Sequence, residues 1–524
     1  MKKVVVLGLA IAFWMTANHD TWAQPARPNI ILIMADDMGY SDLGCYGGEI
    51  ETPNLDALAR NGLRFTNFYN AGRCCPTRAS LLTGVYPHQA GIGGMISRSP
   101  SGEEGPYQGF LSRNTVTLAE VLREAGYYTA MSGKWHVGEV RPYWPLDRGF
   151  NDYFGLISGA ANYFDIRKGK NEIKQNFARG NTPYLPPPEN FYMTDAITDH
   201  AVETLENQRD QQQPFFLYIA YTAPHYPLHA LPEDIMRYKG KFSRGWDELR
   251  HERYRRMVAM GIADESMPLT AKDPLIPSWR EIENKEEFEL KMEIYAAQLD
   301  RMDQGIGKVL EKLRDIGKLE NTLILFLSDN GATAEGGLEG EDYRQNGLPP
   351  GGVESFQSYG RGWAHLSNTP FRYYKMWMHE GGIATPLIVS WPQVIKNPGA
   401  IVRYPGHIID VMATAIDLAG ARYPDSYNGN SIVPLEGITL APLLRGDDRK
   451  AQEFLFWEHM GNKAVMKGRW KLVARKHEGD GQWALYDLSR DRAEENDLAA
   501  DYPHVVKELH EAYVRWSEKT GARR

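Results

Sequence analysis

Two hydrophobic runs, each leading into acidic or amide side chains, constrain the fold of this chain most strongly. The first spans 29–35 and is followed by Asp36-Asp37. The second spans 322–327 and leads, after a serine, into Asp329-Asn330. A continuous apolar run leaves no polar face for water, so each run predicts a strand buried on both sides, as in a parallel sheet covered by helices.

Helix signals alternate with further strand-like runs. A helix is expected after Thr52 as its cap, with Pro53 at its first position, and a second after the capping box formed by Thr117 and Glu120. Other expected elements are a long helix over 286–316 and strands over 215–221 and 386–391. The alternation predicts an α/β fold with a large doubly wound mixed sheet flanked by helices.

The pattern of predicted elements changes near residue 450. Short strand patterns cover 454–457, 464–473 and 483–488, with turn signals between them, and an amphipathic helix pattern covers 502–519. We therefore predict a large domain over 24–450 and a small C-terminal subdomain over 451–524, an antiparallel sheet with one helix. The segment 336–362 is rich in Gly, Pro and aromatic residues and is expected to form a long functional loop.

The first 23 residues have the pattern of a signal peptide. Lys2 and Lys3 precede an apolar stretch over 4–14, and Thr21-Trp22-Ala23 resembles a cleavage site. The stretch is shorter than the about 20 residues that span a membrane, which disfavours the alternative of a retained anchor. The chain has three cysteines and no Asn-x-Ser/Thr sequon. We expect a secreted protein of the bacterial periplasm or cell surface, with no membrane span after signal removal.

The overall charge excludes one class of partner. Among 524 residues the formal net charge is -8, so no general basic field for nucleic acid is expected. A local cationic pocket for an anionic substrate is compatible with this balance.

The residues after the two buried runs have the chemistry of metal ligands. Asp36, Asp37, Asp329 and Asn330 offer oxygen atoms only, which suits Ca²⁺ or Mg²⁺. Ligands gather at the carboxyl ends of parallel strands, where these residues would lie. The alternative is structural: Asp36-Asp37 would cap a turn, and Asp329-Asn330 would start one.

The segment Cys74-Cys75-Pro76-Thr77-Arg78-Ala79-Ser80-Leu81-Leu82-Thr83-Gly84 carries the sharpest signal. It resembles the core motif of the type I sulfatase family of the alkaline phosphatase superfamily, Cys-x-Pro-Ser/Thr-Arg followed by an Ala-Ser-Leu-Leu-Thr-Gly-like sequence. The resemblance implies that Cys74 is oxidised to formylglycine by a maturation enzyme and that Cys75 fills the variable position. The alternative is a vicinal cysteine pair without this modification.

The modification has a chemical rationale. The hydrate of an aldehyde carries two hydroxyls on one carbon. One attacks sulfur, and the other then expels sulfate without attack of water on sulfur, which divides one difficult step into two. By the same resemblance, the four oxygen ligands and the modified Cys74 would hold Ca²⁺, in preference to Mg²⁺.

Four further segments carry the resemblance. In Gly133-Lys134-Trp135-His136-Val137-Gly138, Lys134 would bind sulfate oxygens and His136 would hold the formylglycine hydroxyl. His225, after the run 215–221, would protonate the leaving alcohol, with His229 as a rival. Lys375 would bridge sulfate and leaving oxygen, Arg78 would pair with formylglycine and the carboxylates, and His379 is a candidate substrate contact. After Leu485-Tyr486-Asp487-Leu488 this chain lacks the proline that many family members have.

These features predict a sulfuric ester hydrolase of arylsulfatase type. Its substrate would be a small-molecule or glycan sulfate ester, with sulfated carbohydrates as a natural class. The alternatives are a phosphonate or phosphate ester hydrolase of the same superfamily, a catalytically silent protein that binds sulfated glycans, and a protein that uses Ca²⁺ only to fold. The sequence leaves the leaving group and the oligomeric state open.

Overall fold

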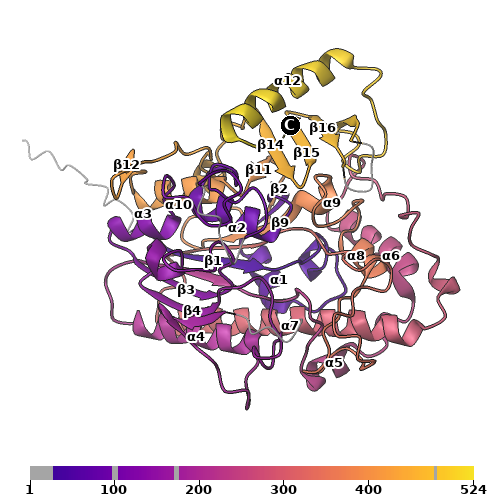
Figure 1. Cartoon of the computed structure of the whole chain (residues 1–524), viewed down its shortest axis with the longest axis horizontal. Helices are drawn as coiled ribbons and strands as arrows, with labels where there is room; N and C mark the ends of the chain where they lie inside the picture. The colour runs from indigo at the N-terminus through magenta and orange to yellow at the C-terminus, as the bar shows by residue number, and fades with distance from the viewer. Residues whose placement is uncertain (1–26, 97–103, 170–175, 477–480, 524) are drawn as a thin grey trace, which may run out of the picture.

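A computed structural model describes residues 27–96, 104–169, 176–476 and 481–523. The signal peptide expected over 1–23 lies outside these residues. The described chain forms a large mixed sheet between two layers of helices, with a small sheet and one helix above it (Figure 1). The predicted fold class is confirmed.

The large sheet has eleven strands. In chain order they are β1 (Asn29–Ala35), β2 (Leu63–Tyr69), β3 (Tyr128–Gly133), β4 (Asp152–Leu156), β5 (Phe177–Arg179), β6 (Thr182–Pro183), β7 (Phe215–Ala220), β8 (Thr322–Ser328), β9 (Ala384–Ser390), β10 (Ile401–Val402) and β11 (Gly406–His407). Their spatial order is β10-β2-β9-β8-β1-β7-β3-β4-β5-β6, and β11 pairs with β2. The strands β8, β1, β7, β3 and β4 run parallel, whereas β9 is antiparallel to both of its neighbours. The sheet is therefore mixed.

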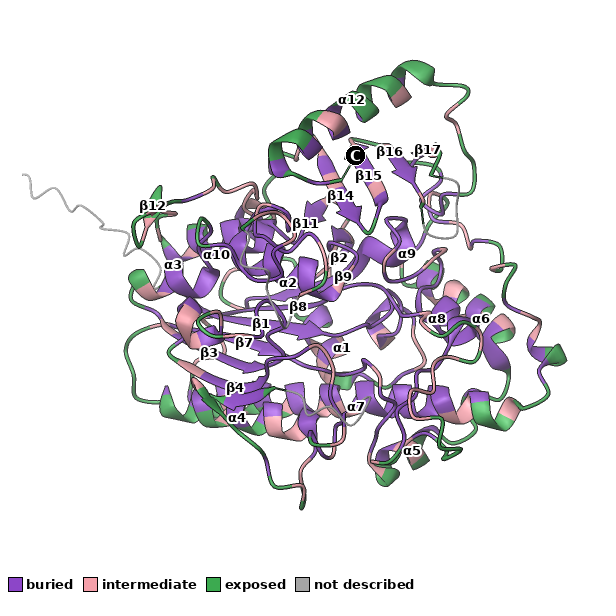
Figure 2. Cartoon of the chain, viewed as in Figure 1, coloured by how far each residue is buried: buried purple, intermediate pink, exposed green. Residues whose placement is uncertain are grey.

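Successive residues of β1 face opposite layers. Ile31 and Ile33 pack into the core beneath the sheet, with α1 (Pro53–Arg60), α4 (Met193–Asn207) and α7 (Lys285–Asp315). Ile30 and Leu32 pack into the core above it, with α2 (Cys74–Thr83), α3 (Leu118–Glu124) and α10 (Asp410–Ala419). Figure 2 shows the buried strands between helices whose outer faces are exposed. Burial on both faces explains why these strands read as continuous apolar runs.

Further elements complete the large domain. They are η1 (Gly44–Tyr46), η2 (Pro145–Arg148), α5 (Pro232–Tyr238), α6 (Gly245–Ala259), η3 (Trp279–Glu281), α8 (Arg361–Ser367), α9 (Glu380–Ile383), the β12–β13 hairpin (Ser426–Tyr427, Asn430–Ser431) and α11 (Ala441–Arg445).

Of the two expected helix caps, one is present as predicted. Thr117 and Glu120 form the reciprocal capping box of α3. The side chain of Thr52, by contrast, does not cap α1; its hydroxyl accepts from Gly44 N and donates to Asp56. The carboxylate of Asp303, on α7, instead accepts the first N–H groups of α1. A residue distant in sequence therefore provides the cap.

The C-terminal segment forms the expected antiparallel sheet and helix. Its strands β14 (Leu455–His459), β15 (Asn462–Lys467), β16 (Trp470–Ala474) and β17 (Trp483–Asp487) pair in sequence order, and α12 (Pro503–Thr520) packs on β15 and β16. The sheet is tied to the large domain by Trp457, whose indole N–H donates to Asn70 O over 2.8 Å.

The register of the parallel strands brings their carboxyl ends to one edge. Ala35 at the end of β1 lies opposite Ser328 at the end of β8, and Gly133 at the end of β3 lies opposite Ala220 at the end of β7. Gly133 has φ +113°, and a Cβ there would lie 1.9 Å from Ala220 O. Only glycine fits this position, from which the chain turns out of the sheet.

Candidate active site

Three charged side chains leave the sheet at this edge, each directly or nearly directly after a strand. Asp36 follows β1, Lys134 follows β3 and Asp329 follows β8. The Lys134 ammonium lies 2.6 Å from Asp36 Oδ2, and Asp37 N–H donates to Asp329 Oδ1 over 3.2 Å. All are fully buried. The predicted ligand residues are thus brought together by parallel strand pairing.

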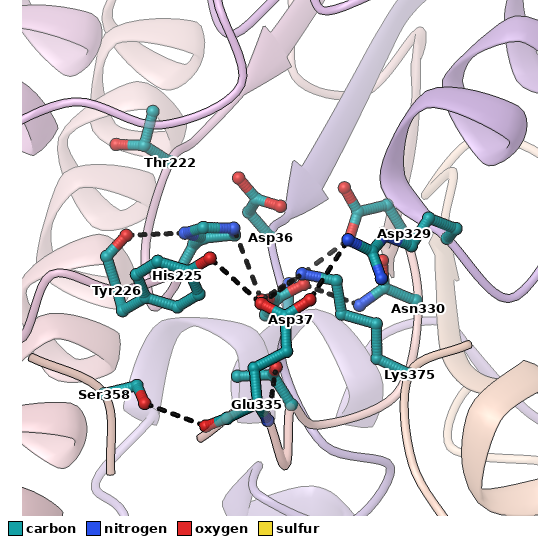
Figure 3. Close-up of polar contacts among 12 residues, drawn as sticks. Asp36, Asp37, Thr222, His225, Tyr226, Asp329, Asn330, Glu335, Ser358 and Lys375 are labelled. Atoms are coloured by element: carbon teal, nitrogen blue, oxygen red, sulfur yellow. Dashed lines mark hydrogen bonds and ion pairs between the residues drawn. The ribbon is translucent and has the colours of Figure 1, made fainter. Parts of the chain in front are cut away.

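Asp37 is the centre of the polar network in Figure 3. Asn330 donates to its Oδ1 over 2.7 Å, and Lys375 Nζ lies 2.9 Å from its Oδ2. His225 Nε2 is 3.5 Å from the same Oδ2. Burial raises the pKa of Asp37, but Lys375 and His225 outweigh it and bring the pKa to about 2. Asp37 is therefore an anion at neutral pH.

Arg78 pairs with Asp329, a second acidic residue of the cluster. Its Nε and Nη2 donate to Asp329 Oδ2 over 3.1 and 2.7 Å, and its Nη1 donates to Lys134 O over 3.0 Å. Burial and the neighbouring Asp36 nevertheless raise the pKa of Asp329 to about 7. The three buried carboxylates Asp36, Asp37 and Asp329 face three cations, Arg78, Lys134 and Lys375, yet burial still disfavours the ionised form of Asp329.

Two oxygen atoms of the cluster are left without hydrogen bonds. Within the described residues, Asp36 Oδ1 and Asn330 Oδ1 are buried and accept none. Buried acceptors are normally satisfied, so orphaned ones require an explanation. Together with Asp37 and Asp329 they form an all-oxygen donor set, which fits a hard cation.

Cys74 is the first residue of α2, beside this cluster. The potential ligand atoms of Cys74, Cys75 and His136 all lie within 4.8 Å of one another. A hydrogen bond from Cys75 lowers the pKa of the Cys74 thiol well below its usual range, helped by His136 and Lys134. His136 Nε2 lies 3.4 Å from Cys75 Sγ. A Cβ on Gly159 would lie 2.4 Å from His136 Nε2, so the glycine makes room for the ring.

Of the two candidate acids, His225 and His229, only His225 lines the cavity onto which Cys74 opens. Burial lowers its pKa to about 4, so the imidazole is neutral at neutral pH. His229 accepts from Tyr163 N–H over 3.3 Å, and its Nε2 lies 2.9 Å from Ser355 O. His379 packs edge-on against Tyr373 and lines no part of the cavity. The rival acid His229 and the candidate substrate contact His379 therefore both have structural surroundings.

A cavity of about 260 Å³ opens onto Cys74. It is lined by Arg73, Cys74, Met95, Ile96, His136, Glu139, Gly159, Ala160, His225, Tyr226, Phe356 and Lys375. The sequence interpretation missed Arg73 among these residues, together with its partner Glu335. Arg73 Nη2 lies 3.0 Å from Glu335 Oε1, and Tyr226 donates to Glu335 Oε2 over 2.9 Å. The only sequence signal was the position of Arg73, directly before Cys74.

Comparison with known proteins identifies the family. The sulfatase family model matches residues 28–421, and the model "N-sulphoglucosamine sulphohydrolase, C-terminal" matches 371–519. The chain belongs to the sulfatase family. It is 36% identical to an arylsulfatase of Klebsiella aerogenes, over 80% of this chain and 93% of that one. It is 29% identical to human arylsulfatase A, over 85% of this chain and 74% of that one.

The fold comparison agrees. A crystal structure titled "Ps i-CgsB in complex with k-i-k-neocarrahexaose" superposes with a TM-score of 0.70 at 24% identity, covering 94% of this chain and 93% of that one. The sulfatase is therefore an enzyme that hydrolyses sulfuric esters, with the fold of the alkaline phosphatase superfamily. No helix among the described residues is long and apolar enough to cross a membrane.

Proposed function

We propose that this sulfatase acts through a formylglycine made from Cys74, beside a Ca²⁺ ion held by Asp36, Asp37, Asp329 and Asn330. One observation supports this most directly. Cys74 lines a cavity with His136, His225 and Lys375, and the last two contact Asp37 of the buried all-oxygen cluster, which has two orphaned acceptors. When present, the aldehyde hydrate supplies a nucleophilic hydroxyl and a second hydroxyl that releases sulfate. The cation supplies charge for the sulfate oxygens.

Lys134 and Lys375 are placed to bind the sulfate group. Each ammonium contacts a carboxylate of the cluster, Asp36 at 2.6 Å and Asp37 at 2.9 Å. A cation bound to those carboxylates would share their negative charge, so that the remaining N–H groups of both lysines could donate to sulfate oxygens. Donors fixed in a buried site stabilise developing charge more strongly than they would in water.

His225 would give a proton to the leaving oxygen. It is neutral in the free site because burial lowers its pKa to about 4. An anionic ester beside it favours the imidazolium, so proton uptake would accompany substrate binding. His136 would hold the hydroxyl of the modified Cys74, since its ring lies among the two thiol groups and is kept in place beside Gly159.

Sulfated saccharides are the substrate class that the cavity wall favours. Arg73 lines the cavity, and its Nε and Nη1 are buried without hydrogen bonds among the described residues. These N–H groups suit the hydroxyls or anionic substituents of a sugar, whereas a plain aryl group would leave them unsatisfied. A structural relative is titled as a complex with "its substrate D-Glucosamine-2-N, 6-O-disulfate". Export through the signal peptide over 1–23, to a bacterial periplasm or cell surface, would place the enzyme among such glycans.

The test is co-expression with a formylglycine-generating enzyme, followed by a substrate panel. Sulfate release would be measured by ion chromatography from 4-nitrophenyl sulfate and from monosulfated and disulfated sugars, with 4-nitrophenyl phosphate and a matched phosphonate as controls. We expect sulfate esters to be cleaved with the higher kcat/KM and mass spectrometry to find the aldehyde at Cys74. Faster cleavage of the phosphate or phosphonate would refute the reaction, and an unmodified Cys74 in active enzyme would refute the nucleophile.

A further inference from the structure

Arg250, on α6, is a buried cation without an anion. It is 6% exposed, and its Nη groups donate only to Thr270, over 2.7 Å to the carbonyl, and to Pro370 O over 3.1 Å. Its Nε has no hydrogen bond, and no carboxylate of the described residues lies within ion-pair distance. Arg253, one turn along the same helix, is also buried but pairs with Asp42 at 2.9 Å and with Glu49. A buried charge is normally paired, so Arg250 is the exception.

His365, on α8, lines the same cavity as Arg250 and also has polar atoms without hydrogen bonds. It is 2% exposed, and among the described residues neither ring nitrogen has a hydrogen-bond partner. Burial and the nearby cations Arg250 and Arg361 lower the pKa of His365 well below its usual range, so the ring is neutral. A neutral imidazole offers one donor and one acceptor, and here both are unused.

These two side chains line a cavity of about 460 Å³, and this cavity shares lining residues with a larger one. The larger cavity, of about 820 Å³, shares Ala271, Lys272 and His365 and adds Arg361, Arg372 and Arg475. Neither lining includes a residue of the cavity at Cys74. The two cavities therefore form a separate, strongly basic place at the junction of α6, α8 and the C-terminal sheet.

The carboxylates of these walls already have partners. Asp273 pairs with Arg361 at 2.8 Å, Asp247 lies 3.3 Å from Lys272, and Glu495 accepts from Ala271 N–H over 2.6 Å. Five cations face these three carboxylates across the joint lining. The excess positive charge includes Arg250, which no carboxylate in the described part of the chain reaches.

We propose that the paired cavities, with Arg250 and His365 at their centre and Lys272 at their rim, form a second binding site for an oxyanion of the sulfate type. The guanidinium Nε and the imidazole N–H would donate to it, and Lys272 would add charge from the rim. The anion is either free sulfate, the product, or a second sulfate group of a polysulfated saccharide. The choice of sulfate rests on the proposed function, whereas the existence of an oxyanion site rests on Arg250 and His365 alone.

The direct test is a crystal of the full mature protein soaked in sodium selenate, with anomalous scattering measured at the selenium edge. We expect a selenium peak within hydrogen-bond distance of Arg250 Nε and the His365 ring. The proposal would be overturned if this peak were absent at every selenate concentration tested, including concentrations at or above the one that gives a peak beside Cys74. The readout needs no turnover, so failure of the proposed reaction would leave it unaffected.

Variants measure the same site in solution. Selenate affinity by calorimetry is expected to fall at least fivefold in Lys272→Met and in His365→Phe, and to stay unchanged in the control Lys239→Met, at an exposed lysine outside both linings. Unchanged affinity in both folded cavity variants would refute the site.

The source of the anion is then read from kinetics. If kcat/KM of Lys272→Met falls for a polysulfated oligosaccharide but not for 4-nitrophenyl sulfate, the site binds a distal sulfate of the substrate. If selenate binding is weakened and both kcat/KM values are unchanged, it binds the free ion. Both results support an oxyanion site, and they differ only in the origin of the ligand.

Discussion

Removal of the Lys471 ammonium, by Lys471→Met, should destabilise the protein far more than an ordinary lysine substitution. Lys471 lies on β16, fully buried, with its Nζ 2.9 Å from Glu380 Oε1 and 2.8 Å from Glu494 Oε1. Arg492 completes the cluster, with Nε 2.7 Å from Glu380 Oε2. The cluster joins the C-terminal sheet to α9, five residues after Lys375, so it also supports the segment that carries a candidate catalytic lysine.

The magnitude follows from what remains after the change. Methionine fills most of the space, but two carboxylates stay buried with one cation between them. Removal of one partner of a buried ion pair costs about 3–5 kcal/mol. Burial and Glu380 already raise the pKa of Glu494 to about 7, above its value in an unfolded chain. Because this pKa is above the unfolded value of 4.5, ionisation of Glu494 destabilises the folded protein as pH rises. Loss of Lys471 raises the pKa of Glu494 further. The stability that Lys471→Met loses relative to the wild type should therefore grow as pH rises beyond 7.

The assay is urea unfolding followed by tryptophan fluorescence at pH 6 and pH 8.5. The matched control is Lys467→Met, on the neighbouring strand β15, where the lysine is 37% exposed and pairs with Glu508 and Glu453 at the surface. Exposed pairs contribute about 0–1 kcal/mol, so the control should unfold almost as the wild type does. Equal losses for the two variants, or a deficit of Lys471→Met that shrinks from pH 6 to pH 8.5, would contradict the reasoning.

The remaining predictions concern the site and its charge. Cys74→Ala should abolish sulfate release while the melting temperature stays near that of the wild type, and Cys75→Ala should keep activity; loss of activity in both would disprove the choice of nucleophile. Removal of calcium by a chelator should stop turnover, and added Ca²⁺ should restore it; full activity of metal-free enzyme would contradict the ligand assignment. Arg73→Met should raise KM for a disulfated sugar more than for 4-nitrophenyl sulfate, and equal changes would exclude a role in substrate choice. Stability should fall as pH is lowered from 6.5 to about 4. Histidines of the unfolded chain are protonated in this range, whereas buried histidines such as His225 and His407 stay neutral in the folded protein because burial lowers their pKa. A melting temperature that stays constant over this range would refute this.

The local patterns predicted much of the fold because they depend on neighbours in sequence. Apolar runs mark strands buried on both faces, and the capping box of Thr117 and Glu120 marks the start of α3. Since parallel strands share one edge for their carboxyl ends, the residues after β1 and β8 had to meet once those strands paired. The candidate metal ligands could therefore be predicted from the strand patterns, whereas Cys74 was predicted from the resemblance of its motif to that of the sulfatase family.

Pairings between distant segments were not accessible in this way. Asp303, not Thr52, accepts the first N–H groups of α1, and Glu335 is the partner of Arg73. Any carboxylate suits either position, and only packing brings one of many within reach. For the same reason the sequence does not distinguish Arg250 from Arg253. They lie on one helix, three residues apart. Carboxylates from other segments surround Arg253, whereas none among the residues that the structure describes reaches Arg250. The amino-acid order determined which chemistry this protein carries and at which edge of the sheet, whereas the packing of remote segments determined which charges are neutralised and which remain available to a ligand.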